Sequence, residues 1–204
     1  MKKSGRPGKN EESRACKEAI FQAAVSLIEE SGAGSVTVRK VIEKAGVSTG
    51  TFYHYFADKN DLMMAFVRED SFDGFLLETP MEDIAGRMTE LYLHLIRKYQ
   101  ALGKTFMKSF YTTDNRALSA YMNEQDGVFI PGTVMARSET ELKAAAEKGI
   151  LKADTDLHQL AKDLCTMVKG CVFEWCLTED GMDIGETLGR IFGRYFASLT
   201  AQDR

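Results

Sequence analysis

Apolar residues recur three and four positions apart along most of this chain, which is the spacing of one face of an α-helix. Glycine, proline and polar stretches interrupt the pattern and separate the predicted helices. The pattern therefore predicts an all-α protein of about nine helices, over residues 13–31, 37–45, 49–55, 58–77, 81–100, 104–111, 127–148, 156–177 and 183–199. Because proline is tolerated only near a helix start, the helix in 127–148 can begin as late as Pro131.

Two short predicted helices and a tight turn occupy the first part of the stretch 37–62. Gly46 can take the left-handed conformation that ends the first helix, and Ser48 can cap the second. Phe52 and Phe56 lie four residues apart and can pack on the first helix. A helix, a glycine turn and a short helix rich in hydroxyl and aromatic side chains are typical of a helix-turn-helix, whose second helix enters the DNA major groove. The alternative is a generic helical hairpin with a buried Phe pair.

The run from Ala45 to Leu62, AGVSTGTFYHYFADKNDL, resembles the DNA-binding motif of the TetR family of transcriptional regulators. Ala33 and Ile42 depart from the usual pattern, which suggests altered packing between the first two helices. The resemblance implies a three-helix DNA-binding domain, joined by a connecting helix to a helical domain for ligand binding and dimerisation. It also implies the DNA-contact set Thr37, Ser48, Thr49, Thr51, Tyr53, His54, Tyr55 and Lys59.

The predicted domains are a flexible basic arm over 1–12, the helix-turn-helix domain over 13–58 and an effector-binding and dimerisation domain over 59–204. The arm contains Gly5-Arg6-Pro7, which resembles arms that lay an arginine into the minor groove. It can equally be a tail that adds only non-specific attraction to phosphates.

The charge is divided in the way a protein with one DNA-facing end requires. Residues 1–68 carry eleven Lys and Arg against eight Asp and Glu, a net +3, while residues 69–204 carry fifteen against twenty-two, a net −7. The basic excess therefore accompanies the motif, although the whole chain is acidic at −4.

The middle of the chain is rich in aromatic residues and methionine, the side chains that line small-molecule pockets. Together with the resemblance, this predicts a pocket for a small-molecule effector of unknown class that is at least partly apolar. Its predicted lining is Tyr92, Tyr99, Phe106, Phe110, Tyr121, Met135 and Trp175. The alternative for each of these residues is an ordinary place in the core.

The last predicted helix carries glycines four residues apart, each of which costs about 1 kcal/mol relative to alanine in a helix interior. Close approach of another helix would explain them. The resemblance implies that the last two helices pair with their copies in a homodimer, through Gly185, Gly189, Gly193, Phe192 and Phe196. Packing against the middle helices of the same chain is the alternative.

Several classes of function are disfavoured by the sequence. It has no run of eighteen apolar residues and no secretory signal, so we expect no membrane contact and a cytoplasmic protein that is nucleoid-associated when bound to DNA. The four cysteines are expected as small buried side chains, with a redox or metal site as the alternative. No catalytic or metal motif is present, so we expect neither an enzyme nor a cofactor. The expected function is a TetR-like regulator that acts as a repressor, binds a pseudo-palindromic double-stranded DNA operator as a dimer and is released from it by an effector. An architectural DNA-binding protein of the same fold is the rival.

Overall fold

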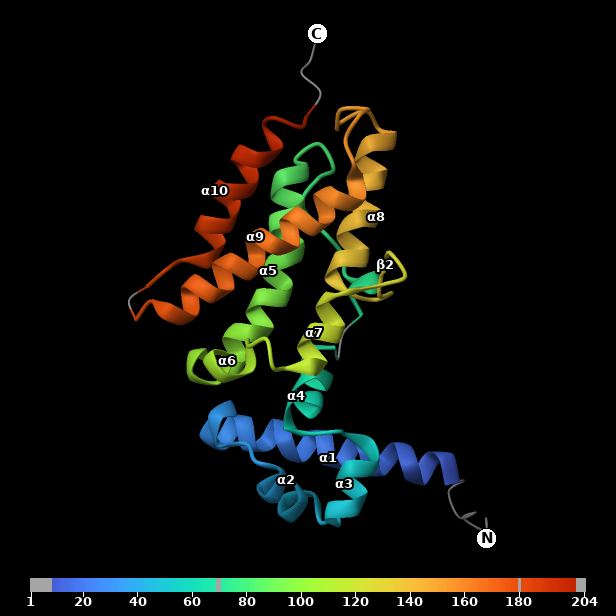
Figure 1. Ribbon diagram of the computed structural model, residues 1–204, viewed down its shortest axis with the longest axis vertical. Helices are drawn as coiled ribbons and strands as arrows, with labels where there is room; N and C mark the ends of the chain where they lie inside the picture. Colours follow the sequence, from blue (N-terminus) through green and yellow to red (C-terminus); the bar gives the residue numbers. More distant parts are fainter. Residues whose placement is uncertain (1–8, 69–70, 180, 201–204) are drawn as a thin grey trace. The chain divides into compact units, whose positions relative to one another are not determined.

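The computed structural model describes residues 9–68, 71–179 and 181–200, and these residues are mostly helical (Figure 1). They form ten α-helices, two short 3-10 helices and one two-stranded sheet. The all-α prediction is confirmed, with one helix more than expected, over Arg116–Met122. The chain divides into two compact units, Met1–Phe66 and Val67–Arg204, which we call the N-terminal and C-terminal units. The roles assigned to the predicted domains remain predictions.

Helices α1 (Lys9–Ser31), α2 (Val38–Ala45) and α3 (Thr49–Tyr55) make up most of the N-terminal unit. Local chemistry sets their ends. The Thr37 hydroxyl accepts a hydrogen bond from the Lys40 amide at 3.2 Å, and Ser48 accepts one from the Thr51 amide at 3.0 Å. Gly46 ends α2 in the left-handed conformation, with φ 67° and ψ 31°, as predicted.

The core of the N-terminal unit holds the turn between α2 and α3 in place. Phe52 and Phe56 are buried with ring centroids 5.8 Å apart, and Ile20 of α1 and Val41 of α2 are fully buried. Complete burial of one such side chain stabilises the fold by about 1.5–3 kcal/mol. The predicted packing of the Phe pair is therefore present, and it fixes which face of α3 is turned outward.

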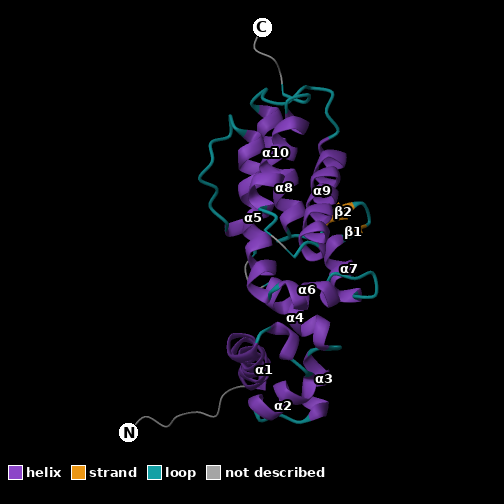
Figure 2. Ribbon diagram, turned by 90° about the vertical axis from the view of Figure 1, so that its left-hand side faces the viewer, coloured by secondary structure: helices purple, strands orange, loops and turns teal. Residues whose placement is uncertain are grey.

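The C-terminal unit is built around α5 (Ile84–Leu102), which packs against α6 (Lys104–Phe110), α8 (Val134–Glu147) and α10 (Ile184–Phe196). The long helix α9 (Leu157–Leu177) packs on α6, α8 and α10 (Figures 1 and 2). Asp156 and Asp183 cap α9 and α10, which begin close to the predicted positions, by accepting hydrogen bonds from backbone amides at 3.0 and 2.9 Å.

The predicted helix over 58–77 is wrong in its second half. Helix α4 (Lys59–Val67) ends ten residues earlier, and the 3-10 helix η2 (Phe72–Gly74) follows. The cause is tertiary. Phe72 is buried, its amide donates to the Gly132 carbonyl at 3.1 Å, and its ring meets His94 edge-on at 5.5 Å.

The predicted helix over 127–148 is wrong in its first part. Strands β1 (Glu124–Gln125) and β2 (Val128–Phe129) form an antiparallel hairpin there (orange in Figure 2). Asp126 and Gly127 make its turn with φ of 53° and 77°, the left-handed pair that a two-residue hairpin requires. Helix α8 begins only after Thr133 caps it.

No helix among the described residues is both long and apolar enough to cross a membrane.

Candidate functional site

The outward face of α3 combines small polar side chains with one large aromatic side chain. Thr49, Gly50, Tyr53 and His54 are exposed, and Thr51 is half-buried. Tyr53 has 54% of its surface exposed, while its ring rests edge-on against buried Phe52 at 5.3 Å. This contact holds the base of the tyrosine and leaves its hydroxyl end available.

Other hydroxyls of the predicted DNA-contact set are engaged inside the N-terminal unit. Thr37 caps α2, and the Ser48 hydroxyl lies 2.8 Å from that of Thr51 while it caps α3. Tyr55 is half-buried and its hydroxyl donates to Ser13 Oγ on α1 at 3.1 Å. Tyr55 therefore positions α3 against α1. Lys59, the last member of the set, is half-buried at the first position of α4.

Gly50 is a member of this surface that the sequence analysis did not single out. A Cβ built there would meet only Ser48 Oγ within 4 Å, at 3.8 Å. No packing inside the unit calls for glycine, although glycine costs about 1 kcal/mol in a helix relative to alanine. Its signal in the sequence was the glycine itself, at the second position of the predicted seven-residue helix.

The basic side chains of the N-terminal unit differ in their partners. Arg39 pairs with Glu43 at 2.9 Å, and Lys44 pairs with Glu30 at 2.7 Å. The hydrogen bond from Lys44, followed by one from Ser26, lowers the pKa of Glu30. Lys17 lies with its Nζ 5.6 Å from the centroid of the Phe56 ring.

The predicted effector residues all lie in the C-terminal unit, where Tyr121 and Met135 line two different cavities. Six of them are buried, namely Tyr92, Tyr99, Phe106, Phe110, Tyr121 and Met135. Trp175 is half-buried with Lys104 Nζ 5.3 Å from its ring centroid. The Tyr92 hydroxyl lies 3.3 Å from Ser138 Oγ, so it already has a hydrogen-bond partner within the core.

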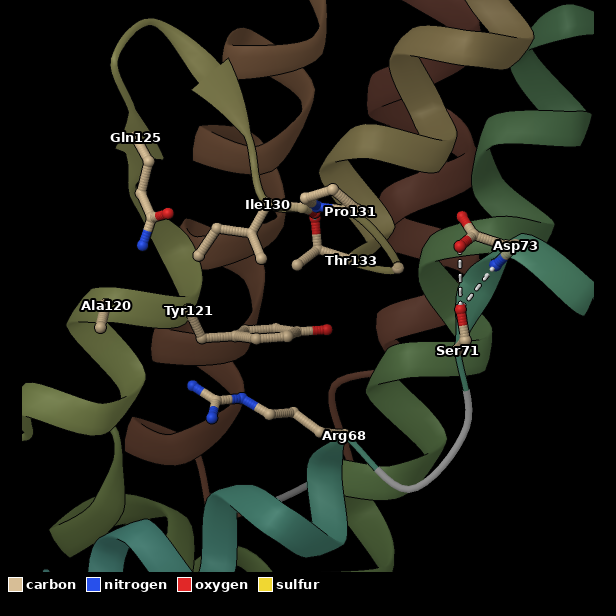
Figure 3. A pocket seen from close by; sticks show the side chains of 10 residues that line it. Arg68, Ser71, Asp73, Ala120, Tyr121, Gln125, Ile130, Pro131 and Thr133 are labelled. Carbon is tan, nitrogen blue, oxygen red and sulfur yellow. Dashed lines mark hydrogen bonds between the residues drawn. The ribbon is translucent and has the colours of Figure 1, made fainter.

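Tyr121 lines a cavity of about 510 Å³ among α7 (Arg116–Met122), the hairpin, η2 and the start of α8 (Figure 3). The Arg68 guanidinium lies over the Tyr121 ring at 5.4 Å and donates to the Ala117 carbonyl at 3.4 Å. Burial, partly opposed by Arg68, raises the pKa of Tyr121 to about 12, so this phenol stays neutral near pH 7. Met135 lines a different cavity of about 440 Å³, beside Cys165 and Lys169.

The residues predicted for the dimer interface divide into packed and open positions. A Cβ at Gly185 would lie 3.6 Å from Leu93 of α5, and one at Gly189 would lie 3.8 Å from Thr89. Phe192 and Phe196 are buried inside the chain. Gly193 is open, and so is Gly170 on α9, with nothing within 4 Å of a Cβ at either position. Packing within one chain thus involves four of the five predicted residues.

The cysteines are free, and burial raises the pKa of the thiols of Cys165, Cys171 and Cys176. Among the described residues, no group of three or more His, Cys, Asp or Glu side chains is placed to hold a metal ion.

Comparisons with known proteins give the family. Residues 20–66 match the family model described as bacterial regulatory proteins, tetR family. The uncharacterized HTH-type transcriptional regulator YvdT of Bacillus subtilis is 37% identical over 71 residues, which are 35% of this chain and only 34% of that relative. The fatty acid metabolism regulator protein of Bacillus subtilis is 24% identical over 181 residues, with 81% of this chain and 86% of the relative covered.

Solved structures show the same fold over nearly the whole chain. A TetR-family regulator from Syntrophomonas wolfei has a TM-score of 0.62 at 16% identity, covering 93% of this chain and 99% of its own. Thermus thermophilus FadR, a TetR-family repressor solved with lauroyl-CoA, has a TM-score of 0.61 at 21% identity, covering 89% and 93%. Both structures are described as those of TetR-family transcriptional regulators. With its helix-turn-helix and its family match over residues 20–66, this chain belongs to the TetR family of transcriptional regulators.

Proposed function

We propose that the protein is a repressor that binds a pseudo-palindromic DNA operator as a homodimer and that a small-molecule effector releases it. The observation that supports this most directly is the outward face of α3, where Thr49, Gly50, Tyr53 and His54 are exposed together. A short helix with polar tips, held by a buried Phe pair, suits insertion into the major groove.

Each exposed side chain of α3 has a role in this proposal. The Tyr53 hydroxyl donates a hydrogen bond to a phosphate. The Lys59 ammonium group, near the N-terminus of α4, does the same. Thr49, Thr51 and His54 meet base edges, where a threonine methyl can contact thymine. Thr37, Ser48 and Tyr55 keep the two helices in position through the hydrogen bonds described above. Gly50 lets the backbone of α3 approach the DNA closely.

The proposed dimer uses the open faces of α9 and α10. Gly170 and Gly193 are helical glycines with no close neighbour in the chain, and each costs about 1 kcal/mol relative to alanine. Close approach of a second copy explains both. The exposed charges beside them, Glu174 on α9 and Arg190 on α10, are opposite in sign and can pair across a two-fold axis. To bind a pseudo-palindrome in successive major grooves, such a dimer needs its two α3 helices about 34–36 Å apart, one helical turn of DNA.

The effector part of the proposal is supported by relatives of the same fold. FadR was solved with lauroyl-CoA, and RolR, with a TM-score of 0.61 at 20% identity, was solved with resorcinol. An effector releases DNA only through its difference in affinity for two states of the dimer. About 1–3 kcal/mol of coupling corresponds to a 5–150-fold loss of operator affinity.

The test begins with selection of duplexes from a random DNA pool by the purified protein. Tyr53→Ala and Thr49→Ala should each lower the affinity for the enriched duplex by about 5–150-fold, since one good contact is worth about 1–3 kcal/mol. Gln22→Ala, on the exposed side of α1, is the control and should change nothing. Unchanged affinity in Tyr53→Ala would refute the assigned face. Enrichment of many unrelated sequences would instead support the architectural alternative.

A further inference from the structure

Two buried phenol groups in the C-terminal unit lack hydrogen-bond partners. The hydroxyls of Tyr99 on α5 and Tyr111 after α6 are both enclosed, and neither has a partner among the described residues. The two rings are neighbours, with centroids 6.1 Å apart and planes at 66°. A buried polar group without a partner lowers stability, and here two such groups occur side by side.

Phenylalanine would fill the same space at either position without that cost. Tyr92, in the same core, is the contrasting case, because its hydroxyl has a hydrogen-bond partner in Ser138 Oγ at 3.3 Å. The contrast indicates that the hydroxyls of Tyr99 and Tyr111 serve a molecule outside the chain.

An apolar groove reaches the Tyr111 side chain from the surface. It has a volume of about 290 Å³ between α6 and α9 and is lined by Met107, Lys108, Tyr111, Phe173, Cys176 and Leu177. Phe173 and Leu177 are more than half exposed, which is unusual for such large apolar side chains. The volume is at the lower end of the range for small-molecule sites, so it suits a compact molecule.

We propose that this α6–α9 groove binds a compact apolar effector, of one ring or a short chain, whose carbonyl or carboxylate oxygen accepts a hydrogen bond from Tyr111. The inference rests on the proposed function, in which an effector exists, and it adds the site and the chemical class. The Tyr99 ring is the neighbour of the Tyr111 ring, and its hydroxyl is a second unpartnered donor close by.

The electrostatics of the groove agree with an acceptor oxygen on the ligand. Burial raises the pKa of both tyrosines, so their hydroxyls stay protonated and act as donors near pH 7. Burial also raises the pKa of the Cys176 thiol, and the positive charges of Lys108 and Lys104 oppose that shift. Both charges are therefore close to the Cys176 side of the groove. Lys104 donates to the Thr178 carbonyl at 2.7 Å, and Lys108 is exposed at the mouth.

The experiment compares acetophenone with ethylbenzene, which has the same ring and a similar size but no oxygen. Isothermal titration of the purified full-length protein should show one acetophenone site per chain and at least about tenfold weaker binding of ethylbenzene. Tyr111→Phe should remove that preference, whereas Tyr92→Phe should keep it. Persistence of the preference in Tyr111→Phe would overturn the assignment.

The stability of the ligand-free protein gives a second measurement. Tyr99→Phe and Tyr111→Phe should unfold in urea at the same concentration as the parent protein or at a higher one, because each removes an unpartnered hydroxyl. Tyr92→Phe should unfold at a lower concentration, because its hydroxyl has a partner. A lower midpoint for both Tyr99→Phe and Tyr111→Phe would show that the chain or bound water satisfies these groups, which contradicts the proposal.

Phe173 and Leu177 share the exposed face of α9 with Gly170 and Glu174 of the proposed dimer, so a second copy is the competing occupant. Met107→Ala, which changes the α6 wall of the groove, should weaken acetophenone binding and leave the sedimentation coefficient unchanged. Dissociation of the dimer with unchanged acetophenone binding would mean that a partner copy covers the groove, and the proposal would be wrong. If acetophenone binds with the expected preference but does not alter affinity for the enriched duplex, the groove assignment stands and its regulatory role in the proposed function fails.

Discussion

A buried carboxylate between two arginines offers the sharpest stability test in the C-terminal unit. Glu141 on α8 accepts from Arg87 of α5 at 2.7 Å and from Arg137 of its own helix at 2.8 Å. Its side chain is only 8% exposed. Arg87 also donates to the Thr79 carbonyl and Arg137 to the Asp73 carbonyl. One negative charge thus holds both guanidinium groups where they fix the segment before α5.

We expect Glu141→Gln to lower the free energy of unfolding by about 3 kcal/mol. Breaking a buried ion pair by removing one partner costs about 3–5 kcal/mol, because the other charge is left without compensation. Here two positive charges would be left, which favours the upper end of the range. The side chains of Arg87 and Arg137 are 15% and 20% exposed, however, so water can partly solvate them. The lower end is therefore the expected value.

Urea unfolding at a fixed protein concentration measures the loss, since the stability of a dimer depends on concentration. Glu43→Gln is the matched control, because its pair with Arg39 has side chains 59% and 86% exposed. Exposed pairs contribute about 0–1 kcal/mol, so this variant should change little. The double variant Glu141→Gln with Arg137→Gln should cost less than the sum of the two single changes, because it removes one uncompensated charge.

The reasoning fails if Glu141→Gln destabilises the protein no more than Glu43→Gln does. That result would mean that water reaches the guanidinium groups as readily as it reaches an exposed pair.

Two further predictions concern pH and the DNA-facing helix. Burial acts to raise the pKa of Glu90, but hydrogen bonds from the amides of Glu78 and Thr79 outweigh it and lower that pKa below its ordinary 4.5. The stabilisation that Glu90 contributes is therefore present above pH 4.5 and is lost as the pH falls through the lowered pKa. Glu90→Gln should consequently make the free energy of unfolding fall less steeply on the acid side of a stability–pH profile. Gly50→Ala should stabilise the free protein by up to about 1 kcal/mol and weaken binding of the enriched duplex, measured by urea unfolding and fluorescence anisotropy; unchanged DNA affinity would contradict close backbone approach.

The helix ends that the sequence predicted well are those that depend on neighbouring residues alone. Asp156 and Asp183 cap their helices through amides three residues away, and Gly46 ends α2 through its own backbone conformation. The hairpin turn at Asp126-Gly127 carried an equally local signal, the Asp-Gly pair. It was missed because the surrounding apolar positions also fit a helix.

The end of α4 depends on contacts that no local pattern contains. Phe72 fits the helical spacing of the stretch before it, yet its amide bonds to Gly132, which is sixty residues away in the sequence. The glycines of α10 show the same limit. Their four-residue spacing predicted the close approach of another helix, but spacing cannot say which helix is the neighbour. For Gly185 and Gly189 the neighbour is α5 of the same chain.

The predicted DNA-contact set was also limited by contacts that no local pattern contains. The resemblance to the TetR family marks the hydroxyls of this stretch as DNA contacts, but a seven-residue helix has no fixed orientation until another helix supports it. In this protein α1 supplies that support, because the Ser13 hydroxyl accepts a hydrogen bond from the Tyr55 hydroxyl. The two residues are 42 positions apart in the sequence. This hydrogen bond turns Tyr55 inward and, with Phe52 buried, leaves Tyr53 on the opposite side. The choice between a residue that reads DNA and one that holds the reading helix is therefore made by packing against α1.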